Sequence, residues 1–184
     1  SLFNIKKELE IKKSKTNFHY LLKSVTDLNS VEFCFSKFKI DVVFHAAAYK
    51  HVYMTENMPQ ATILNNISGT KNIIDTAINR GVSTFVFVST DKAVNPSNIM
   101  GASKRIAEMY VSGISSENKT KIITTRFGNV LGSNGSVVPI FQGQIAKGGP
   151  VTVTHPKVTR FFMTITEACQ LVLEAGATGN HREI

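Results

Sequence analysis

Apolar residues along the chain form two kinds of pattern, short continuous runs and longer stretches with helical spacing. The short runs predict strands at 18–22, 41–45, 84–89, 121–126 and 151–154. The longer stretches predict helices at 2–13, 28–38, 56–80, 98–113, 138–147 and 164–175. Because strands and helices alternate and the strands are apolar throughout, the fold class is α/β, with a doubly wound parallel sheet covered by helices on both faces.

Residues at the ends of these stretches support the helix boundaries. Asp27 is placed to cap the helix at 28–38, and Pro59 fits the first turn of the helix at 56–80. Gly81 follows that helix as a C-terminal cap. Thr164 or Thr166 is the expected cap of the last helix.

One domain is expected over residues 1–184, with a smaller cap region from about residue 128, where a loop is predicted over 128–136. A doubly wound nucleotide-binding sheet opens with a strand, a glycine-rich turn and a helix. No G-x-G-x-x-G motif occurs in the chain. We therefore expect the N-terminal strand and its glycine-rich turn to lie upstream of Ser1.

Composition and charge narrow the function classes only slightly. The net charge is +8, and residues 1–23 hold six lysines against two glutamates, which we interpret as a solvated helix face. Nucleic-acid binding is a weaker interpretation, because basic and aromatic residues are not interleaved.

No apolar run approaches the roughly 18–20 residues of a membrane span. Cys34 and Cys169 are expected to be two buried reduced thiols, and no metal-site spacing is present.

A polar cluster follows the strand at 84–89, where Ser89, Thr90, Asp91 and Lys92 are consecutive. Ligands of open α/β sheets bind at the carboxyl ends of the strands. Met100 and Lys104 come next and are four residues apart, so they share one face of a helix. A thioether cannot transfer a proton, which leaves the carboxylate and the amines of this stretch as candidates for acid–base chemistry.

A second candidate site follows the strand at 41–45. Three small residues, Ala46, Ala47 and Ala48, would let a flat ligand approach the backbone, although a tightly packed turn has the same composition. Lys50 and His51 add an amine and an imidazole at the same sheet edge, which suits an anionic group.

Five stretches, 45–52, 90–96, 100–104, 126–133 and 159–163, carry a resemblance to a known family. They resemble the nucleotide-sugar 4,6-dehydratases of bacterial polysaccharide biosynthesis, which are extended short-chain dehydrogenase/reductases with a Rossmann-like fold, acting mainly on UDP-N-acetylglucosamine. The resemblance is strongest to the branch with methionine in place of the usual tyrosine, at Met100. It implies a bound NAD or NADP, oxidation of the sugar at C4, loss of water across C5 and C6, and reduction at C6.

The resemblance also implies roles for individual residues. The catalytic set comprises Thr90, Asp91, Lys92, Met100 and Lys104. The set expected to bind the cofactor comprises Ala46, Ala47, Ala48, Ser89, Lys104 and Phe127. The set expected to bind the substrate comprises Lys50, His51, Asn129 and Arg160. Asp91 is expected to take the role of the missing tyrosine at C4 and to be the acid for the C6 hydroxyl. Lys92 is expected to be the base at C5, a role that requires a pKa lowered by burial. Arg160 is expected to bind the substrate diphosphate.

The expected partner is a UDP-sugar, with no nucleic acid and no metal. A homo-oligomer is expected, with a cytoplasmic catalytic domain and, in full-length members, an N-terminal membrane region. Two alternatives stay open. A nucleotide-sugar 4-epimerase uses the same scaffold, although Met100 and the Asp91–Lys92 pair argue against it. A non-catalytic nucleotide-sugar-binding domain is the other, because cofactor affinity should collapse without the glycine-rich turn.

Overall fold

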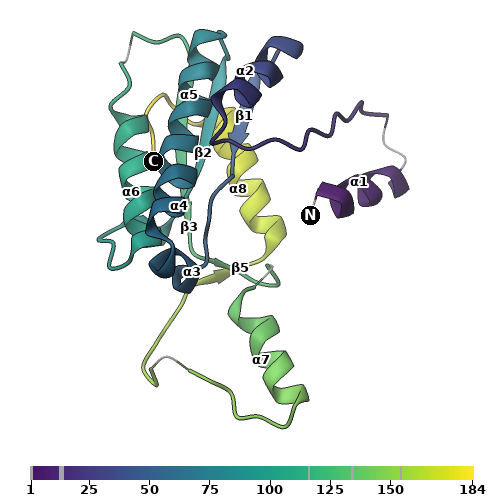
Figure 1. Cartoon of the computed structure of the whole chain (residues 1–184), viewed down its shortest axis with the longest axis vertical. Coiled ribbons are helices and arrows are strands. Elements are labelled where there is room, and N and C mark those ends of the chain that lie inside the picture. The colour runs from purple at the N-terminus through teal and green to yellow at the C-terminus, as the bar shows by residue number, and fades with distance from the viewer. Residues whose placement is uncertain (1, 13–14, 116, 134, 154) are drawn as a thin grey trace.

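A three-stranded parallel sheet forms the centre of the computed structural model, which describes residues 2–12, 15–115, 117–133, 135–153 and 155–184 (Figure 1). The strands are β1 (Val42–His45), β2 (Thr84–Thr90) and β3 (Lys121–Phe127), in the order β1-β2-β3. The register pairs Thr90 with Phe127. Because the strands are parallel, their carboxyl ends share one edge of the sheet, and this edge carries the predicted site.

Helices cover both faces of the sheet, as the sequence predicts (Figure 1). The helices α2 (Leu28–Lys37), α5 (Gly69–Asn79) and α6 (Ile99–Ser112) lie on one side, and α8 (Ile165–Thr178) lies on the other. The core of the first side comprises Val31, Phe35, Ile74, Ala77, Val82, Phe85, Phe87, Ala107, Val111 and Ile122. Val86 points the other way, towards Gly176 of α8, as alternation along a strand requires.

The long helix predicted at 56–80 is divided. The structure has α3 (Val52–Asn57), α4 (Pro59–Ile63), a π-helical turn η1 (Leu64–Ser68) and then α5. Met58 separates the first two with φ −131° and ψ 61°, because the residue before a proline is driven out of the helical region. Pro59 begins α4, as expected. The π-helical turn was not predicted.

Two of the predicted strands are wrong. Residues 18–22 pair with no strand among the described residues, and Leu22 at the end of the run is 86 % exposed. Residues 151–153 are not a strand either, and residue 154 lies outside the described residues. The Gln144 side chain takes the place of a strand partner here: its Oε1 accepts a hydrogen bond from Thr152 N at 3.1 Å.

The predicted loop at 128–136 contains a short strand, β4 (Asn129–Val130), which pairs in parallel with β5 (Phe162–Met163). Residue 134 of that loop lies outside the described residues. The division of the chain near residue 128 stays a prediction. Figure 1 shows β5 and α7 (Val137–Ala146) beyond the lower end of the three-stranded sheet.

The chain ends and caps agree with the sequence in most places. The helix α1 (Leu2–Ile11) stops before 13, and Asp27 caps α2 by accepting from Asn29 N. Thr164, rather than Thr166, caps α8 within a capping box.

The expectation of two buried thiols is wrong: both cysteines are free, but Cys34 is half-buried and Cys169 is exposed. Cys169 is next to the buried Ala168, so it points away from the surface that α8 packs on.

Candidate active site

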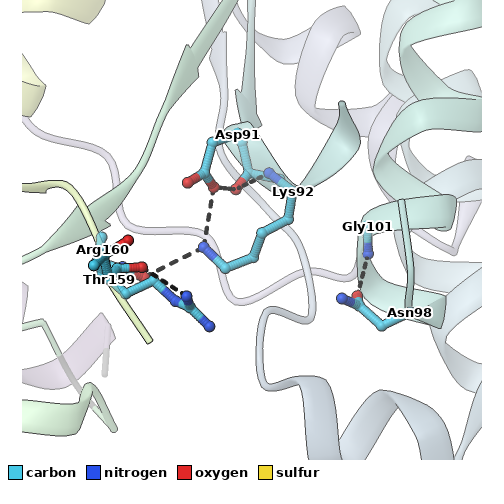
Figure 2. A network of polar contacts seen from close by, with 8 residues as sticks. Asp91, Lys92, Asn98, Gly101, Thr159 and Arg160 are labelled. Carbon is cyan, nitrogen blue, oxygen red and sulfur yellow. Dashed lines mark hydrogen bonds and ion pairs between the residues drawn. The ribbon is translucent and has the colours of Figure 1, made fainter. Parts of the chain in front are cut away.

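Three of the predicted catalytic residues meet at the carboxyl end of β2. Asp91 begins a short 3-10 turn, η2 (Asp91–Ala93), directly after Thr90. The Lys92 amine donates to Asp91 Oδ1 at 3.0 Å, and the Thr90 hydroxyl donates to the same oxygen at 3.0 Å (Figure 2). The Lys92 amine also donates to Asn129 Oδ1 at 3.3 Å. A hydroxyl and an amine therefore both hydrogen-bond the same carboxylate oxygen.

The Asp91 carboxylate is kept ionised by its neighbours. Partial burial raises its pKa, but the hydrogen bonds from Lys92 and Thr90 outweigh burial, so the pKa lies below its ordinary value. The side chains of Asp91 and Lys92 are 44 % and 28 % exposed. Both are accessible to a ligand, and the role expected of Lys92 at C5 stays a prediction.

The start of α6 holds this cluster in place. A Cβ atom at Gly101 would overlap the carbonyl oxygen of Lys92, so only glycine permits this approach. Asn98 Oδ1 caps the helix by accepting from Gly101 N at 2.8 Å (Figure 2). The main chain of η2 is therefore fixed against the helix that carries Met100 and Lys104.

Lys104 is a buried amine at the same edge of the sheet. It is 4 % exposed, its Nζ donates to Val88 O at 2.7 Å, and it lies 4.1 Å from the centre of the Phe87 ring. Burial lowers the pKa of Lys104 to about 8, although the charge of Glu108 acts in the opposite direction. Met100 is 5 % exposed on the same helix. An ammonium group has three N–H donors, and the bond to Val88 O uses one of them.

His45, at the end of β1, pairs with Phe87 in the register of the sheet. Its ring stacks on Phe87 with 5.8 Å between the centres, and its Nε2 is 2.9 Å from Thr70 Oγ1. Burial, and then the positive charge of Lys104, lower the pKa of His45 to about 4. The sequence pattern placed His45 at a strand end but gave it no role.

We expect His45 to make the fold less stable in mild acid. Its unfolded pKa of 6.5 exceeds the folded value of about 4, so the unfolded chain binds more protons between these pH values and the free energy of unfolding rises with pH there. The difference amounts to about 3 kcal/mol. Urea unfolding of His45→Gln from pH 4 to 6.5 should show a flatter pH dependence than the wild type. His19→Gln, at an exposed position, serves as control, and an equal slope in His45→Gln would contradict the expectation.

Small residues and a serine hydroxyl lie at the expected cofactor site. Ala46 and Ala47 are exposed and Ala48 is half-buried at the end of β1. The buried Ser89 hydroxyl makes no hydrogen bond of normal geometry among the described residues, but it lies close enough to the Glu108 carboxylate to lower the pKa of that group. Phe127 ends β3 and is half-buried beside Thr90 in the register. These residues lie on three adjacent strand ends.

A residue that the sequence did not indicate, Asn66, links this edge to α6. It is fully buried in the π-helical turn. Its side chain accepts from Tyr49 N at 2.7 Å and donates to Tyr49 O at 3.0 Å and to Ser103 Oγ at 2.9 Å. Asn66 therefore fixes the backbone that follows the three alanines. The only signal in the sequence is a polar residue on the buried side of a predicted helix.

The expected substrate residues are partly brought together. Asn129 contacts Lys92, and Asn129 N donates to Phe161 O at 3.1 Å, which places the neighbouring Arg160 beside the cluster. In the view of Figure 2, Lys92 lies between Arg160 and Asn98. Arg160 is exposed, and its Nη1 donates to Thr159 O at 2.7 Å.

Lys50 and His51 lie apart from this cluster. Both are exposed in the segment before α3, and neither makes a hydrogen bond to the cluster among the described residues. The His51 ring lies against Gly135, where a Cβ atom would overlap it. His51 therefore contacts the loop after β4 instead.

Among the described residues, no group of three or more His, Cys, Asp or Glu side chains is placed to hold a metal ion. No helix within the described ranges is sufficiently long and apolar to cross a bilayer.

Comparison with known proteins places the chain in a family. The family model described as "Polysaccharide biosynthesis protein" matches residues 1–184. The probable polysaccharide biosynthesis protein EpsC of Bacillus subtilis is 52 % identical over 167 residues, which cover 91 % of this chain and 28 % of EpsC. The capsular polysaccharide biosynthesis protein CapD of Staphylococcus aureus is 50 % identical and covers 100 % of this chain and 31 % of CapD. The chain thus spans about a third of these relatives.

Solved structures agree on the fold. DesIV, a dTDP-glucose 4,6-dehydratase from Streptomyces venezuelae crystallised with NAD and TYD, superposes with a TM-score of 0.86 at 19 % identity, over 97 % of this chain and 61 % of DesIV. Other similar proteins are named UDP-glucose 4-epimerases. The chain belongs to the polysaccharide biosynthesis protein family, and its fold is that of the extended short-chain dehydrogenase/reductases.

Proposed function

We propose that this chain forms the catalytic part of a UDP-N-acetylglucosamine 4,6-dehydratase that makes a UDP-4-keto-6-deoxy sugar for polysaccharide synthesis. The observation that carries the proposal is the Asp91–Lys92 ion pair at the end of β2, which is 3.0 Å long and partly exposed. It lies against the helix whose Met100 stands where related oxidoreductases have a tyrosine. The names of the relatives EpsC and CapD support a role in polysaccharide synthesis.

The strand ends fit part of a nicotinamide dinucleotide. Exposed small side chains at Ala46 and Ala47 leave room above the backbone. The buried Ser89 hydroxyl, which lies near Glu108, is assigned to the same site as a hydrogen-bonding group. The Lys104 amine has N–H donors left for the hydroxyls of a ribose. When bound, NAD or NADP would accept a hydride from the sugar C4 and return it to C6. The NAD in the DesIV crystals supports this choice of cofactor.

Asp91 is suited to two successive proton transfers. Its lowered pKa keeps the carboxylate ionised in the resting protein, ready to take the proton of the C4 hydroxyl. The acid formed in this way can deliver the same proton to the C6 oxygen, which then leaves as water. One group thus serves as base and then as acid, and Thr90, which shares a hydrogen bond with Asp91, would hold the C4 oxygen.

Lys92 is assigned to C5. In its neutral form the amine would take the C5 proton, which the C4 ketone makes acidic, and return it to C5 when C6 is reduced. Asn129 accepts a hydrogen bond from this amine and so fixes its direction. Arg160, exposed and next to the same strand pair, is assigned to the substrate diphosphate, because a guanidinium forms a fork with phosphate oxygens.

The mass of the product tests the proposal. The full-length protein that carries this chain is incubated with UDP-N-acetylglucosamine and NAD, and the product is weighed by mass spectrometry. Loss of one water supports dehydration. An unchanged mass with inversion at C4 would identify a 4-epimerase, the alternative favoured by the relatives of that name. Recovery of unchanged substrate with cofactor bound would identify a binding domain.

The proposal includes a setting for the enzyme. We place the catalytic domain in the cytoplasm, within a homo-oligomer whose full-length chain is anchored to the inner membrane. The resemblance to the methionine-containing branch supports this setting, and size-exclusion chromatography with light scattering of the full-length protein tests the oligomer.

A further inference from the structure

Glu108 is a buried carboxylate that none of the proposed proton transfers uses. Its side chain is 1 % exposed. Its Oε1 accepts from Arg126 Nε at 2.8 Å, and its Oε2 accepts from Arg126 Nη2 at 2.6 Å. Arg105 Nη1, which is more exposed, reaches Oε2 at 3.3 Å. The two parallel bonds from Arg126 form a bidentate fork, the geometry that fixes direction as well as distance.

The fork joins two elements of the candidate active site. Arg126 pairs with Ser89 in the register of β2 and β3, one position before Thr90 pairs with Phe127. Three residues after Arg126 the chain reaches Asn129, which accepts a hydrogen bond from the Lys92 amine. Glu108 lies on α6, one turn after Lys104, on the same face of the helix. The fork therefore holds the strand that leads to Asn129 against the helix that carries Lys104.

The negative charge of Glu108 also links it to Lys104. The buried Lys104 ammonium forms no ion pair with a carboxylate among the described residues. The titratable groups around it are His45 from β1, Glu108 from α6 and, through Glu108, Arg126 from β3. Burial raises the pKa of Glu108, but its interactions with Arg126, Ser89 and Arg105 outweigh burial, so the carboxylate stays ionised at neutral pH. His45 is neutral at that pH, which leaves Glu108 as the nearby anion.

We propose that Glu108 is a positioning residue of the active site, which fixes Arg126 and the strand leading to Asn129 against α6 and whose negative charge keeps the buried Lys104 amine protonated. The inference rests on the proposed function only for the use that the enzyme makes of Lys104 and Asn129. The fork itself, and its effect on the lysine, are properties of the folded chain.

Titration of Lys104 tests the proposal without any substrate. The full-length protein is pulsed with acetic anhydride at a series of pH values, and the acetylated fraction of the peptide that contains Lys104 is measured by mass spectrometry. The wild-type midpoint is expected at about pH 8. In Glu108→Gln, which keeps the shape and removes the charge, the midpoint should fall by roughly one pH unit. Because no substrate is present, failure here is distinct from failure of the dehydration assay.

A double variant keeps the test decisive. Glu108→Gln removes the ion pair of the partly buried Arg126 and can thereby unfold the protein. Glu108→Gln with Arg126→Gln removes both charges, and the midpoint of Lys104 should again fall below the wild-type value. Asp75→Asn, a carboxylate bonded to Tyr110 on the far part of α6, should leave the midpoint unchanged. A wild-type midpoint in the folded double variant overturns the proposal.

Discussion

Turnover of UDP-N-acetylglucosamine should fall about 10³-fold when Asp91 is changed to Asn, and by a similar factor when Lys92 is changed to Ala. Each change removes one group of the ion pair at the end of β2 and with it the proton transfer assigned to that group. The pair is partly exposed, so folding should be little affected. Product formation is measured by mass spectrometry, and binding of UDP by isothermal titration calorimetry should stay near the wild-type value.

A second lysine–aspartate pair in the chain provides the matched control. Lys71 and Asp75 form an ion pair one helical turn apart on α5, away from the strand ends. Lys71→Ala and Asp75→Asn should therefore keep wild-type turnover. Near-normal dehydration by Asp91→Asn or by Lys92→Ala would remove that residue from the mechanism.

Lys104→Met should make the protein more stable and less active at the same time. Burial lowers the pKa of this lysine from 10.5 to about 8, which means that the charged amine is destabilised in the folded chain. Methionine has a similar length and carries no charge, so the free energy of unfolding at pH 7 should rise by roughly 1–3 kcal/mol. Loss of the N–H donors should weaken NAD binding about tenfold to a hundredfold.

The gain in stability has its own pH dependence. Below pH 8 the lysine is protonated in both states, so the penalty is fully present. Between 8 and 10.5 the folded chain loses this proton first, and the difference between wild type and Lys104→Met should shrink. Urea unfolding at several pH values measures it. Lys71→Met, at an exposed position, should change neither stability nor NAD binding, and a destabilised Lys104→Met would contradict the argument.

The sheet was predictable because its strands are short, apolar and separated by helical patterns. That reasoning failed for 18–22, where an apolar run meets no neighbouring strand, and for 151–153, where Gln144 bonds the backbone. Composition alone cannot show either fact, since both depend on what lies nearby in space. The break at Met58 follows from the proline after it and was open to prediction.

In the candidate site, contacts between neighbouring residues could be predicted from the sequence, and contacts between distant segments could not. Thr90, Asp91 and Lys92 are consecutive, so their proximity is local and could be predicted. The fork between Glu108 and Arg126 joins residues 18 apart in the sequence, and the bond between Asn66 and Ser103 joins residues 37 apart. Each depends on how α6 packs on its neighbours. Helical spacing does place Glu108 on the face of Lys104, and that was the one available signal.

The π-helical turn at Leu64–Ser68 makes this segment unusually sensitive to a change in length. A π-helical turn contains one residue more than the α-helical turn it replaces. Deletion of a single residue here would give a more regular helix with better backbone hydrogen bonds. It would also rotate the preceding residues by about 100° relative to α5, so that a side chain at position 66 could no longer reach both Tyr49 and Ser103. A shorter and locally better helix would thus be the worse protein, and substitutions should be tolerated here more readily than deletions.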